Sequence, residues 1–313
     1  MRVPFCLQEV SMRKGPGVNA RKLGQFQDFS CTVPALILIL VFTYYPVVKL
    51  VQISFTDWNL LNDHYNYVGF KNWKWLISGS GTKYLLNSLK VTFLYSLGEL
   101  CITLLGGLVL ALIFNTMGKG FSVMRAIVFM PKYVAMSSAA VVFLWILNTD
   151  NGILNYFLQV LGLPRVDWLG NRHTALISIL MLTGWRAIGY GMIIYLSALR
   201  GIPADYYEAA NLDGASFWQK LFHITLPMLS PTTLFLFVTT FLASMKVFQS
   251  VDIMTAGGPY RSTEVFVYKI YSYAMEDFRM DRASVMALAF FVLLLIITAS
   301  TMRFSNNKVN YDS

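Results

Sequence analysis

The chain has 313 residues, of which 56% are hydrophobic and only 13% are charged, whereas a soluble domain usually carries about 25% charged residues. This composition excludes an ordinary soluble globular protein and predicts a membrane protein with several spans. The net charge of +9 is not clustered with aromatic residues as a nucleic-acid surface requires, so nucleic acid is excluded as a partner.

Six apolar runs are long enough to cross the roughly 30 Å hydrocarbon layer of a membrane as helices. They lie around residues 32–53, 85–114, 126–147, 174–199, 232–251 and 283–302. A transmembrane barrel strand would instead alternate in polarity over about 10 residues, and no stretch keeps that period. We therefore predict an all-α membrane protein with six transmembrane helices in contact with lipid.

The ends of the chain are predicted to lie on the cytoplasmic side. Residues 1–30 form an N-terminal tail, residues 31–302 one transmembrane domain and residues 303–313 a C-terminal tail. The excess of basic residues on the inner side comes from the first tail, with Arg2, Arg13, Lys14, Arg21 and Lys22. Positive charge marks the cytoplasmic side, and an even number of spans returns the C-terminus to it.

Opposite charges occur near the middle of two predicted spans, with Glu99 in the second and Arg186 in the fourth. A charge at mid-membrane depth is costly, so such residues face a partner charge, the bundle interior or a watery path. We expect the two to meet as an ion pair. The alternatives are that Arg186 lies along the solute path, or that Glu99 pairs with a partner subunit.

A first polar helix is predicted in the segment 200–228, between the fourth and fifth spans. Pro203 suits a first helical turn, and Asp205 and Glu208 place negative charge near the positive helix end. Gly214 is a typical residue just past a helix C-terminus. The first helix should therefore stop at this glycine.

A second short helix should follow directly. Ser216 and Gln219 have the spacing of a capping box, in which each side chain bonds the other's backbone N–H. Pro227 and Pro231 interrupt the chain before the fifth span. The segment is thus a helix-turn-helix at the membrane surface.

Small side chains at Ala209 and Ala210 would allow another backbone to approach this helix pair closely. An ordinary helix lying on lipid headgroups would instead need Lys and Arg opposite an apolar face, and Lys220 is the only such residue in the stretch 206–229. The segment is therefore predicted to be a docking surface for another protein.

Aromatic and hydrogen-bonding side chains gather near the end of the fifth span and around Arg186. They are Tyr190, Lys246, Phe248, Gln249 and Asp252. Aromatic faces beside polar groups suit a sugar, which has apolar C–H faces and many hydroxyls. We expect these residues along a solute path, with ordinary packing as the alternative for each aromatic ring.

Catalytic and metal-binding patterns are missing from the sequence. Cys6, Cys31 and Cys101 have no metal-type spacing, and no HExxH, GxSxG or GxxxxGK[ST] motif occurs. We therefore expect no catalytic residue, no metal site, no cofactor in this chain and no nucleotide bound by this chain alone.

Several motifs resemble the permease subunits of binding-protein-dependent ABC importers. Glu208-Ala209-Ala210, then Gly214, then Ile224-x-Leu226-Pro227 match the EAA loop of that family. The sequences VGFKNW, PKYVAMSSAAVVFLWIL and TAGGPYRST resemble its maltose and glycerol-phosphate branch. The resemblance covers most of the chain.

The resemblance implies the type I ABC importer permease fold in a bacterial-type cytoplasmic membrane, with cytoplasmic coupling helices between spans four and five. It implies a heterodimer with a second permease, two ATPase subunits that bind the ATP, and an extracytoplasmic solute-binding protein. ATPase closure would move the EAA loop and switch the spans between inward-facing and outward-facing states. The residues implied in this coupling are Glu208, Ala209, Ala210, Asp213, Gly214, Ile224, Leu226 and Pro227.

The transported solute is expected to be a sugar or oligosaccharide, or alternatively an acidic sugar or glycerol phosphate. This chain departs from the family at three places. The family often has aspartate where Gln249 stands and an uncharged residue where Lys246 stands. Near the start of the sixth span it often has Gly-Tyr-Ala, where this chain has Met280-Asp281-Arg282-Ala283. These departures leave the exact sugar open. Two other classes remain as alternatives, a secondary sugar transporter, which would show paired inverted repeats, and a membrane enzyme acting on a lipid-linked sugar.

Overall fold

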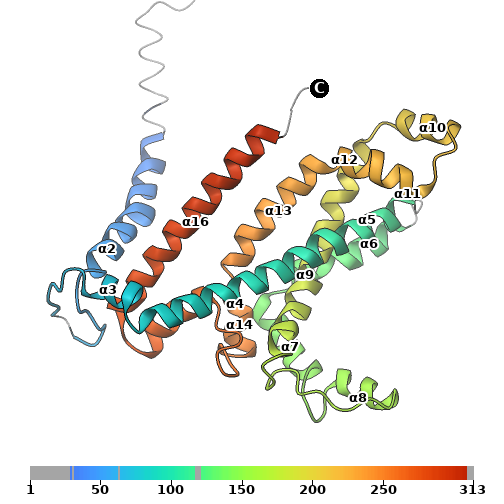
Figure 1. Cartoon of the computed structure of the whole chain (residues 1–313). Coiled ribbons are helices and arrows are strands. Elements are labelled where there is room, and N and C mark those ends of the chain that lie inside the picture. The colour runs from blue at the N-terminus through green and yellow to red at the C-terminus, as the bar shows by residue number, and fades with distance from the viewer. Residues whose placement is uncertain (1–28, 30–31, 63, 117–120, 309–313) are drawn as a thin grey trace, which may run out of the picture. The chain divides into compact units, whose positions relative to one another are not determined.

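The structure is a computed structural model that describes residues 29, 32–62, 64–116 and 121–308. Regular structure in these residues is helical, apart from one isolated antiparallel bridge between Thr56 and Tyr67. The chain divides into two compact units, residues 1–52 and residues 53–313, and each is described by itself. Figure 1 shows the order of the helices.

The first unit contributes one apolar helix, Thr32–Ile53, which includes η1 (Leu40–Tyr44) and runs on as α2 (Tyr45–Ile53). The wider π-helical turn of η1 ends at Tyr44, two residues before Pro46. Proline has no N–H to donate to the preceding turn, and such positions commonly distort a helix. The predicted first span is confirmed as a continuous helix.

The second unit holds the remaining helices. In chain order they are α3 (Lys71–Ser78), α4 (Gly81–Cys101), η2 (Ile102–Gly106), α5 (Gly107–Thr116), α6 (Ser122–Phe129), η4 (Met130–Tyr133), α7 (Met136–Ile146), α8 (Ile153–Val160), α9 (Ala175–Gly201), α10 (Ala204–Leu212), α11 (Phe217–Lys220), η5 (Leu221–Thr225), α12 (Leu226–Met228), α13 (Ser230–Met245), α14 (Gln249–Met254), α15 (Phe266–Tyr271), η6 (Ser272–Glu276) and α16 (Met280–Lys308).

Four helices of the described residues are long and apolar enough to cross a membrane, and the number rises to six when each of two bent helix pairs is one span. The four are Thr32–Ile53, Gly81–Asn115, Ala175–Gly201 and Met280–Thr301. The bent pairs are Ser122–Tyr133 with Met136–Ile146, at 100°, and Phe217–Met228 with Ser230–Met245, at 63°.

The predicted runs 126–147 and 232–251 are therefore wrong as continuous helices. The first contains Pro131, which lies in the 3-10 turn η4, and Val134 follows with an extended backbone. The second run stops at Met245, and a new helix starts only at Gln249. Apolarity gives the length of a span but does not show where its backbone hydrogen bonds are interrupted.

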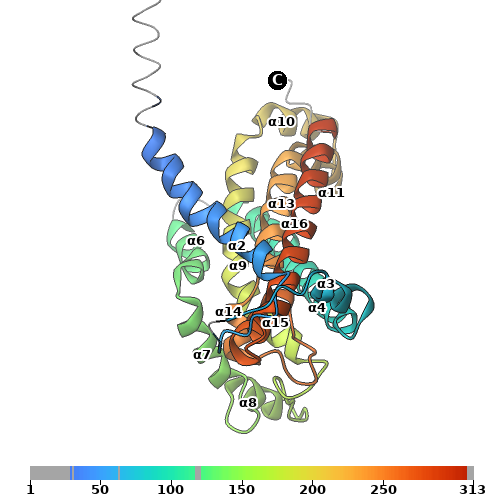
Figure 2. The same ribbon diagram turned by 90° about the vertical axis from the view of Figure 1, so that its left-hand side faces the viewer.

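Helix α9 is the centre of the second unit. It packs against α4, η2, α5, α6, η4, α7, α13 and α14, and Figure 2 shows it flanked by α6 and α13. Glycines permit the closest approaches. A Cβ at Gly189 would lie 2.2 Å from the Val128 carbonyl oxygen, and one at Gly191 would lie 2.3 Å from that of Thr103. Small residues at such contacts are typical of packed membrane helices.

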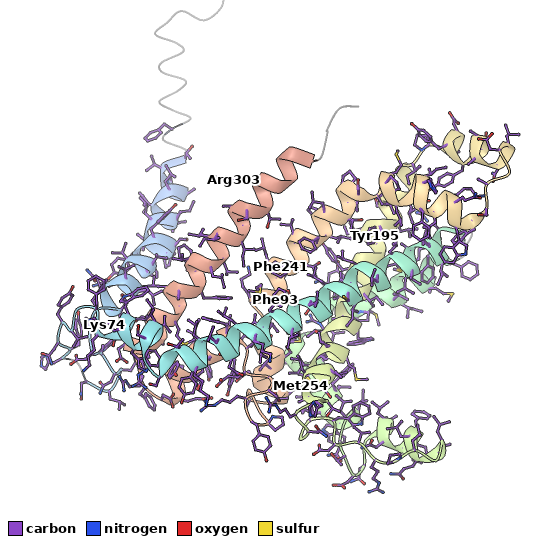
Figure 3. The ribbon with its side chains drawn as sticks, in the orientation of Figure 1. Lys74, Phe93, Tyr195, Phe241, Met254 and Arg303 are labelled. Carbon is purple, nitrogen blue, oxygen red and sulfur yellow. The ribbon has the colours of Figure 1, made fainter. Side chains whose placement is uncertain are left out.

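Tyr195 links the core to α13 (Figure 3). Its side chain is 1% exposed and packs in a cluster with Ala111, Phe114 and Leu236. Its hydroxyl donates to Thr233 Oγ1 at 3.1 Å. A buried tyrosine normally finds a partner for its hydroxyl, and this one joins the two helices that flank the segment 200–228.

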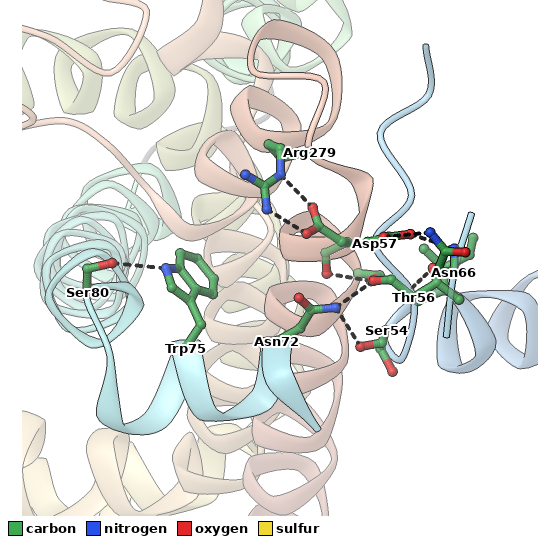
Figure 4. Close-up of polar contacts among 11 residues, drawn as sticks. Ser54, Thr56, Asp57, Asn66, Asn72, Trp75, Ser80 and Arg279 are labelled. Carbon is green, nitrogen blue, oxygen red and sulfur yellow. Dashed lines mark hydrogen bonds and ion pairs between the residues drawn. The ribbon is translucent and has the colours of Figure 1, made fainter. Parts of the chain in front are cut away.

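The loop after residue 53 is held by a polar network (Figure 4). The amide of Asn72 donates to the carbonyls of Ser54 and Thr56 at 3.0 and 2.7 Å. The backbone N–H of Asn66 donates to Asp57 at 2.6 Å and lowers the pKa of that carboxyl. These bonds order the loop that leads into α3.

Candidate functional site

The turn between α10 and α11 has the geometry of a Schellman motif. Gly214 has φ +72°, its N–H donates to the Asn211 carbonyl at 3.1 Å, and the N–H of Ala215 donates to the Ala210 carbonyl at 2.9 Å. Glycine enters the left-handed region without steric cost. The predicted stop of the first helix is confirmed.

The start of the second helix is also as predicted. Ser216 Oγ accepts from the N–H of Gln219 at 3.4 Å, and Gln219 Oε1 accepts from the N–H of Ser216 at 2.7 Å. This reciprocal pair is a capping box, and the helix begins at Phe217.

Side chains tie the two helices to each other. Lys220 Nζ donates to Asn211 Oδ1 at 2.8 Å, and the hydroxyls of Tyr207 and Thr225 lie 3.0 Å apart. Both contacts join α10 to the segment after the turn. Two side-chain hydrogen bonds thus hold the helix pair together.

Some residues of the EAA motif are exposed and others are buried or partly buried. Glu208, Ala209, Asp213, Gly214 and Pro227 are exposed, whereas Ile224 and Leu226 are partly buried. Ala210 is only 9% exposed. The prediction that both alanines offer a surface to another backbone is therefore wrong for Ala210, whose small side chain is buried within the chain.

The second helix has an exposed aromatic face that was not predicted from the sequence. Phe217, Trp218 and Phe222 are exposed, with ring centroids 5.4 and 6.1 Å apart along the row, and Leu212 beside the turn is 91% exposed. The spacing of 218 and 222 places those rings on one helix face. The surface therefore combines an acidic first helix with an apolar second one.

A separate cavity of about 490 Å³ lies among α4, η4, α7, α9 and the connection from α13 to α14. It is lined by Tyr95, Glu99, Lys132, Met136, Thr183, Arg186, Ala187, Ala243, Ser244, Lys246, Val247, Phe248, Gln249 and Ser250. We call it the solute cavity. Glu99, Arg186, Lys246, Phe248 and Gln249 were predicted along a solute path, and the structure brings them together here.

Glu99 and Arg186 do not form the predicted ion pair. The hydroxyl of Tyr95 donates to Glu99 Oε2, and Arg186 donates to Met136 Sδ at 3.4 Å and to the Lys132 carbonyl at 3.2 Å. The ion pairs found among the described residues lie elsewhere, at 264–269 and 279–281. The two charges share a cavity, which agrees with the alternative that Arg186 lies along the solute path.

The wall of the solute cavity includes a helix interruption. Helix α13 ends at Met245, and Phe248 has φ −145° and ψ −64° before α14 begins. The Phe248 ring lies 6.3 Å from that of Tyr268 and 5.0 Å from that of Tyr271. An aromatic wall thus stands beside the exposed side chains of Lys246 and Gln249.

Lys132 is a cavity residue that was missed from the sequence, because it stands in the turn after Pro131. Its Nζ lies 5.0 Å from the centroid of the Tyr190 ring, a cation–π distance. This contact places Tyr190 behind the cavity wall. Neither Tyr190 nor Asp252 lines the cavity itself.

Residues 25–309 match the family described as "Binding-protein-dependent transport system inner membrane component". The chain belongs to this family. Such a component is a transport subunit of a multi-pass membrane complex. Membership favours the ABC importer over the secondary transporter and the lipid-linked-sugar enzyme considered above.

Relatives of this permease are similar along most of their length. The probable ABC transporter permease protein YurN of Bacillus subtilis is 31% identical over 87% of this chain and 93% of its own. The probable ABC transporter permease protein YesP of the same organism is 32% identical over 97% of each. The sn-glycerol-3-phosphate transport system permease protein UgpA of Agrobacterium fabrum is 29% identical over 89% and 94%.

The fold of the permease is also found in a solved structure. A chain of a bacterial ABC transporter involved in the import of the acidic polysaccharide alginate superposes with a TM-score of 0.81, at 24% identity, over 93% of this chain and 99% of that chain. The expected type I ABC importer permease fold is therefore confirmed.

Proposed function

We propose that this permease translocates a sugar or oligosaccharide across the cytoplasmic membrane by alternating access. The observation that carries the proposal is that the helices beside the solute cavity are continuous in the chain with the segment 200–228. Arg186 of the solute cavity lies on α9, which leads into the segment 200–228, and Lys246 lies just past α13, which leads out of it. Motion of that segment therefore reaches both sides of the cavity through two continuous chain connections.

The coupling distance is short enough for rigid transmission. Arg186 and Gly201 are separated by 15 residues of uninterrupted α9, or about 22 Å at a rise of about 1.5 Å per residue. The bond from Tyr195 to Thr233 joins α9 to α13 along this distance. A displacement of the helix pair would tilt both helices together.

The contact with the ATPase would use the exposed residues of the helix pair. Glu208 offers a charge, Gly214 the turn, and the row of Phe217, Trp218 and Phe222 an apolar anchor. Aromatic residues in a partner's cleft commonly dominate binding energy. ATP would be bound by the ATPase subunits, and this chain would need no cofactor.

The partners would be a second, homologous permease in a heterodimer, two ATPase subunits and an extracytoplasmic solute-binding protein. The family description names dependence on a binding protein. A similar structure is titled as a bacterial alginate ABC transporter in complex with a periplasmic protein bound to an alginate pentasaccharide. These names support the assembly proposed for this chain.

A sugar fits the solute cavity chemically. Phe248 supplies an aromatic face. Hydrogen-bonding groups come from Lys246 and Gln249 near Phe248 in the chain, and from Thr183 on α9. The names of UgpA and of the alginate transporter refer to a glycerol phosphate and a polysaccharide. Both solutes are rich in hydroxyl groups, which supports this class of cargo.

The proposed topology places both termini in the cytoplasm, with the transmembrane domain over residues 31–302 and the coupling segment over 200–228. The predicted tail 1–30 lies outside the described residues apart from Phe29, and helix α16 continues to Lys308 within the predicted tail 303–313. The coupling segment must face the ATPases, so the end of the bundle that carries α10 and α11 would be cytoplasmic.

A purification in mild detergent tests the function. Affinity-tagged permease should bring down an ATPase and a homologous permease, and the purified complex should hydrolyse ATP, whereas the permease chain alone should not. A Glu208→Gln variant, which keeps the shape of the surface and removes one charge, should still assemble but should import less solute. Uptake by the isolated chain driven by a proton or sodium gradient would refute the proposal.

A further inference from the structure

A second cavity lies between α6 and α9, which pack side by side (Figures 1 and 2). Its volume is about 440 Å³, and it shares no residue with the solute cavity. Its walls hold two arginines, two serines and four apolar side chains. The lining residues are Ser122, Arg125, Ala126, Phe129, Ile193, Leu196, Ser197 and Arg200.

Polarity changes in one direction along α6. Ser122 and Arg125 occupy the first turn, and Ala126 and Phe129 follow farther along the helix. At a rise of about 1.5 Å per residue, the wall runs from polar to apolar over about 10 Å. The polar part is the end at which this helix begins.

Polarity changes in the opposite chain direction along α9. Ile193 and Leu196 come first, and Ser197 and Arg200 come last. Leu196 is buried, whereas Ser197 and Arg200 are exposed. The polar part is the end at which this helix finishes, just before α10.

The two walls therefore agree in space, because one helix starts where the other ends. One end of the cavity carries two guanidinium groups and two hydroxyls, and the other end is apolar. Guanidinium groups bind phosphate oxygens with two parallel hydrogen bonds. A ligand that matches both halves has a phosphate at one end and a hydrocarbon chain at the other.

We propose that this cavity is a binding site for an anionic phospholipid. The headgroup phosphate lies between Arg125 and Arg200, with Ser122 and Ser197 as additional donors, and an acyl chain lies against the apolar wall. Basic pockets between transmembrane helices bind anionic headgroups in other membrane proteins. The inference needs only that the chain is embedded in a membrane and does not depend on its cargo.

A free phosphate would use the guanidinium groups but leave the apolar wall around Phe129 and Leu196 without a ligand. An acidic peptide would have the same shortcoming. Arg200 is the residue before Gly201, at which α9 ends, so the bound lipid would lie near the connection to the coupling segment. The match of both halves favours the lipid.

Native mass spectrometry of the purified complete transporter tests the proposal. Detergent micelles are doped with phosphatidylglycerol or with zwitterionic phosphatidylcholine, and the lipid retained on the permease is measured. The wild-type permease should retain phosphatidylglycerol about tenfold to thirtyfold more strongly than phosphatidylcholine. The double variant Arg125→Gln with Arg200→Gln should lose this preference.

The matched control is Lys74→Gln with Arg172→Gln, which removes the same charge from exposed positions outside the cavity. This control should keep the wild-type preference. Ala126→Trp, which fills the cavity and keeps both arginines, should also reduce retention. This variant separates a site from a general attraction between the anionic lipid and a basic protein.

Any one of several outcomes would overturn the proposal. They are equal retention of the two lipids by wild type, loss of the preference in the exposed control, unchanged retention in Ala126→Trp, and displacement of the lipid by glycerol 1-phosphate at equal concentration. The last would show a site for free phosphate. If the arginine variant loses a partner subunit and keeps its lipid, the cavity is a protein interface.

Discussion

Substitution of Gly214 tests whether the sharp turn between the coupling helices is needed for coupling. Gly214 has φ +72°, a conformation that costs an ordinary L-residue about 1–2 kcal/mol. Apart from its two chain neighbours, a Cβ at this position would meet no atom of the described residues within 4 Å. Within the chain, the effect of a substitution is therefore backbone strain alone.

A cost of this size lowers the population of the turn about 5-fold to 30-fold. Asparagine tolerates the left-handed region best among non-glycine residues, and β-branched valine tolerates it least. We expect coupling to fall in the order Gly214, Gly214→Asn, Gly214→Ala, Gly214→Val. Because the turn is exposed, the amount of permease inserted in the membrane should stay unchanged.

The assay is ATP hydrolysis by the complete transporter in proteoliposomes, stimulated by its solute-binding protein. The amount of permease in each sample is measured in parallel by immunoblot. Wild-type stimulation in Gly214→Val would refute the requirement for this turn. A defect in Gly214→Asn as large as that in Gly214→Val would refute the strain argument and show instead that the partner tolerates no side chain there.

Three further changes probe other parts of the molecule. Glu208→Gln should lower solute uptake severalfold while the ATPase still copurifies; loss of the ATPase would make this residue essential for assembly. Arg186→Gln should change the uptake of solutes relative to one another and leave the yield of complex intact, and an equal decrease for every solute tested would contradict a place in the solute path. Gly189→Ala places a Cβ 2.2 Å from a carbonyl oxygen of α6, so it should lower stability in detergent by about 1–3 kcal/mol, measured as a lower melting temperature. Gly201→Ala, where a Cβ meets nothing within 4 Å, is the control and should melt as wild type does.

The coupling helix pair was largely predictable because short-range interactions form it. The stop at Gly214 and the cap at Ser216 and Gln219 involve residues within five positions of each other. Such signals depend on backbone geometry that one or two residue types supply. The buried position of Ala210 was not predictable, because it follows from how the helix packs.

Part of the lining of the solute cavity was predictable from the sequence, but its contacts were not. Glu99 and Arg186 were expected together because charges in a membrane avoid lipid. The partner of Glu99 is instead Tyr95, one turn earlier on the same helix. A hydrogen bond between residues four positions apart forms within one helix and does not require two distant spans to pack together. Lys132 was missed because it stands in the 3-10 turn η4, just before the bend at residues 134–135, and the apolar pattern does not show that bend.

The interruption between α13 and α14 has a consequence for how such a transporter changes its cargo over evolution. A helix end leaves backbone N–H and carbonyl groups without intrahelical partners, and residues 246–248 place such an end in the cavity wall. A substitution changes the side chain but leaves the main-chain polar groups in the protein. The N–H groups of Lys246 and Val247 already donate to the carbonyls of Ala243 and Ser244, so the capacity that remains is that of main-chain carbonyls, which have two lone pairs each. Mutations there can alter size and charge preference one residue at a time, while these carbonyls can still accept hydrogen bonds from hydroxyl groups.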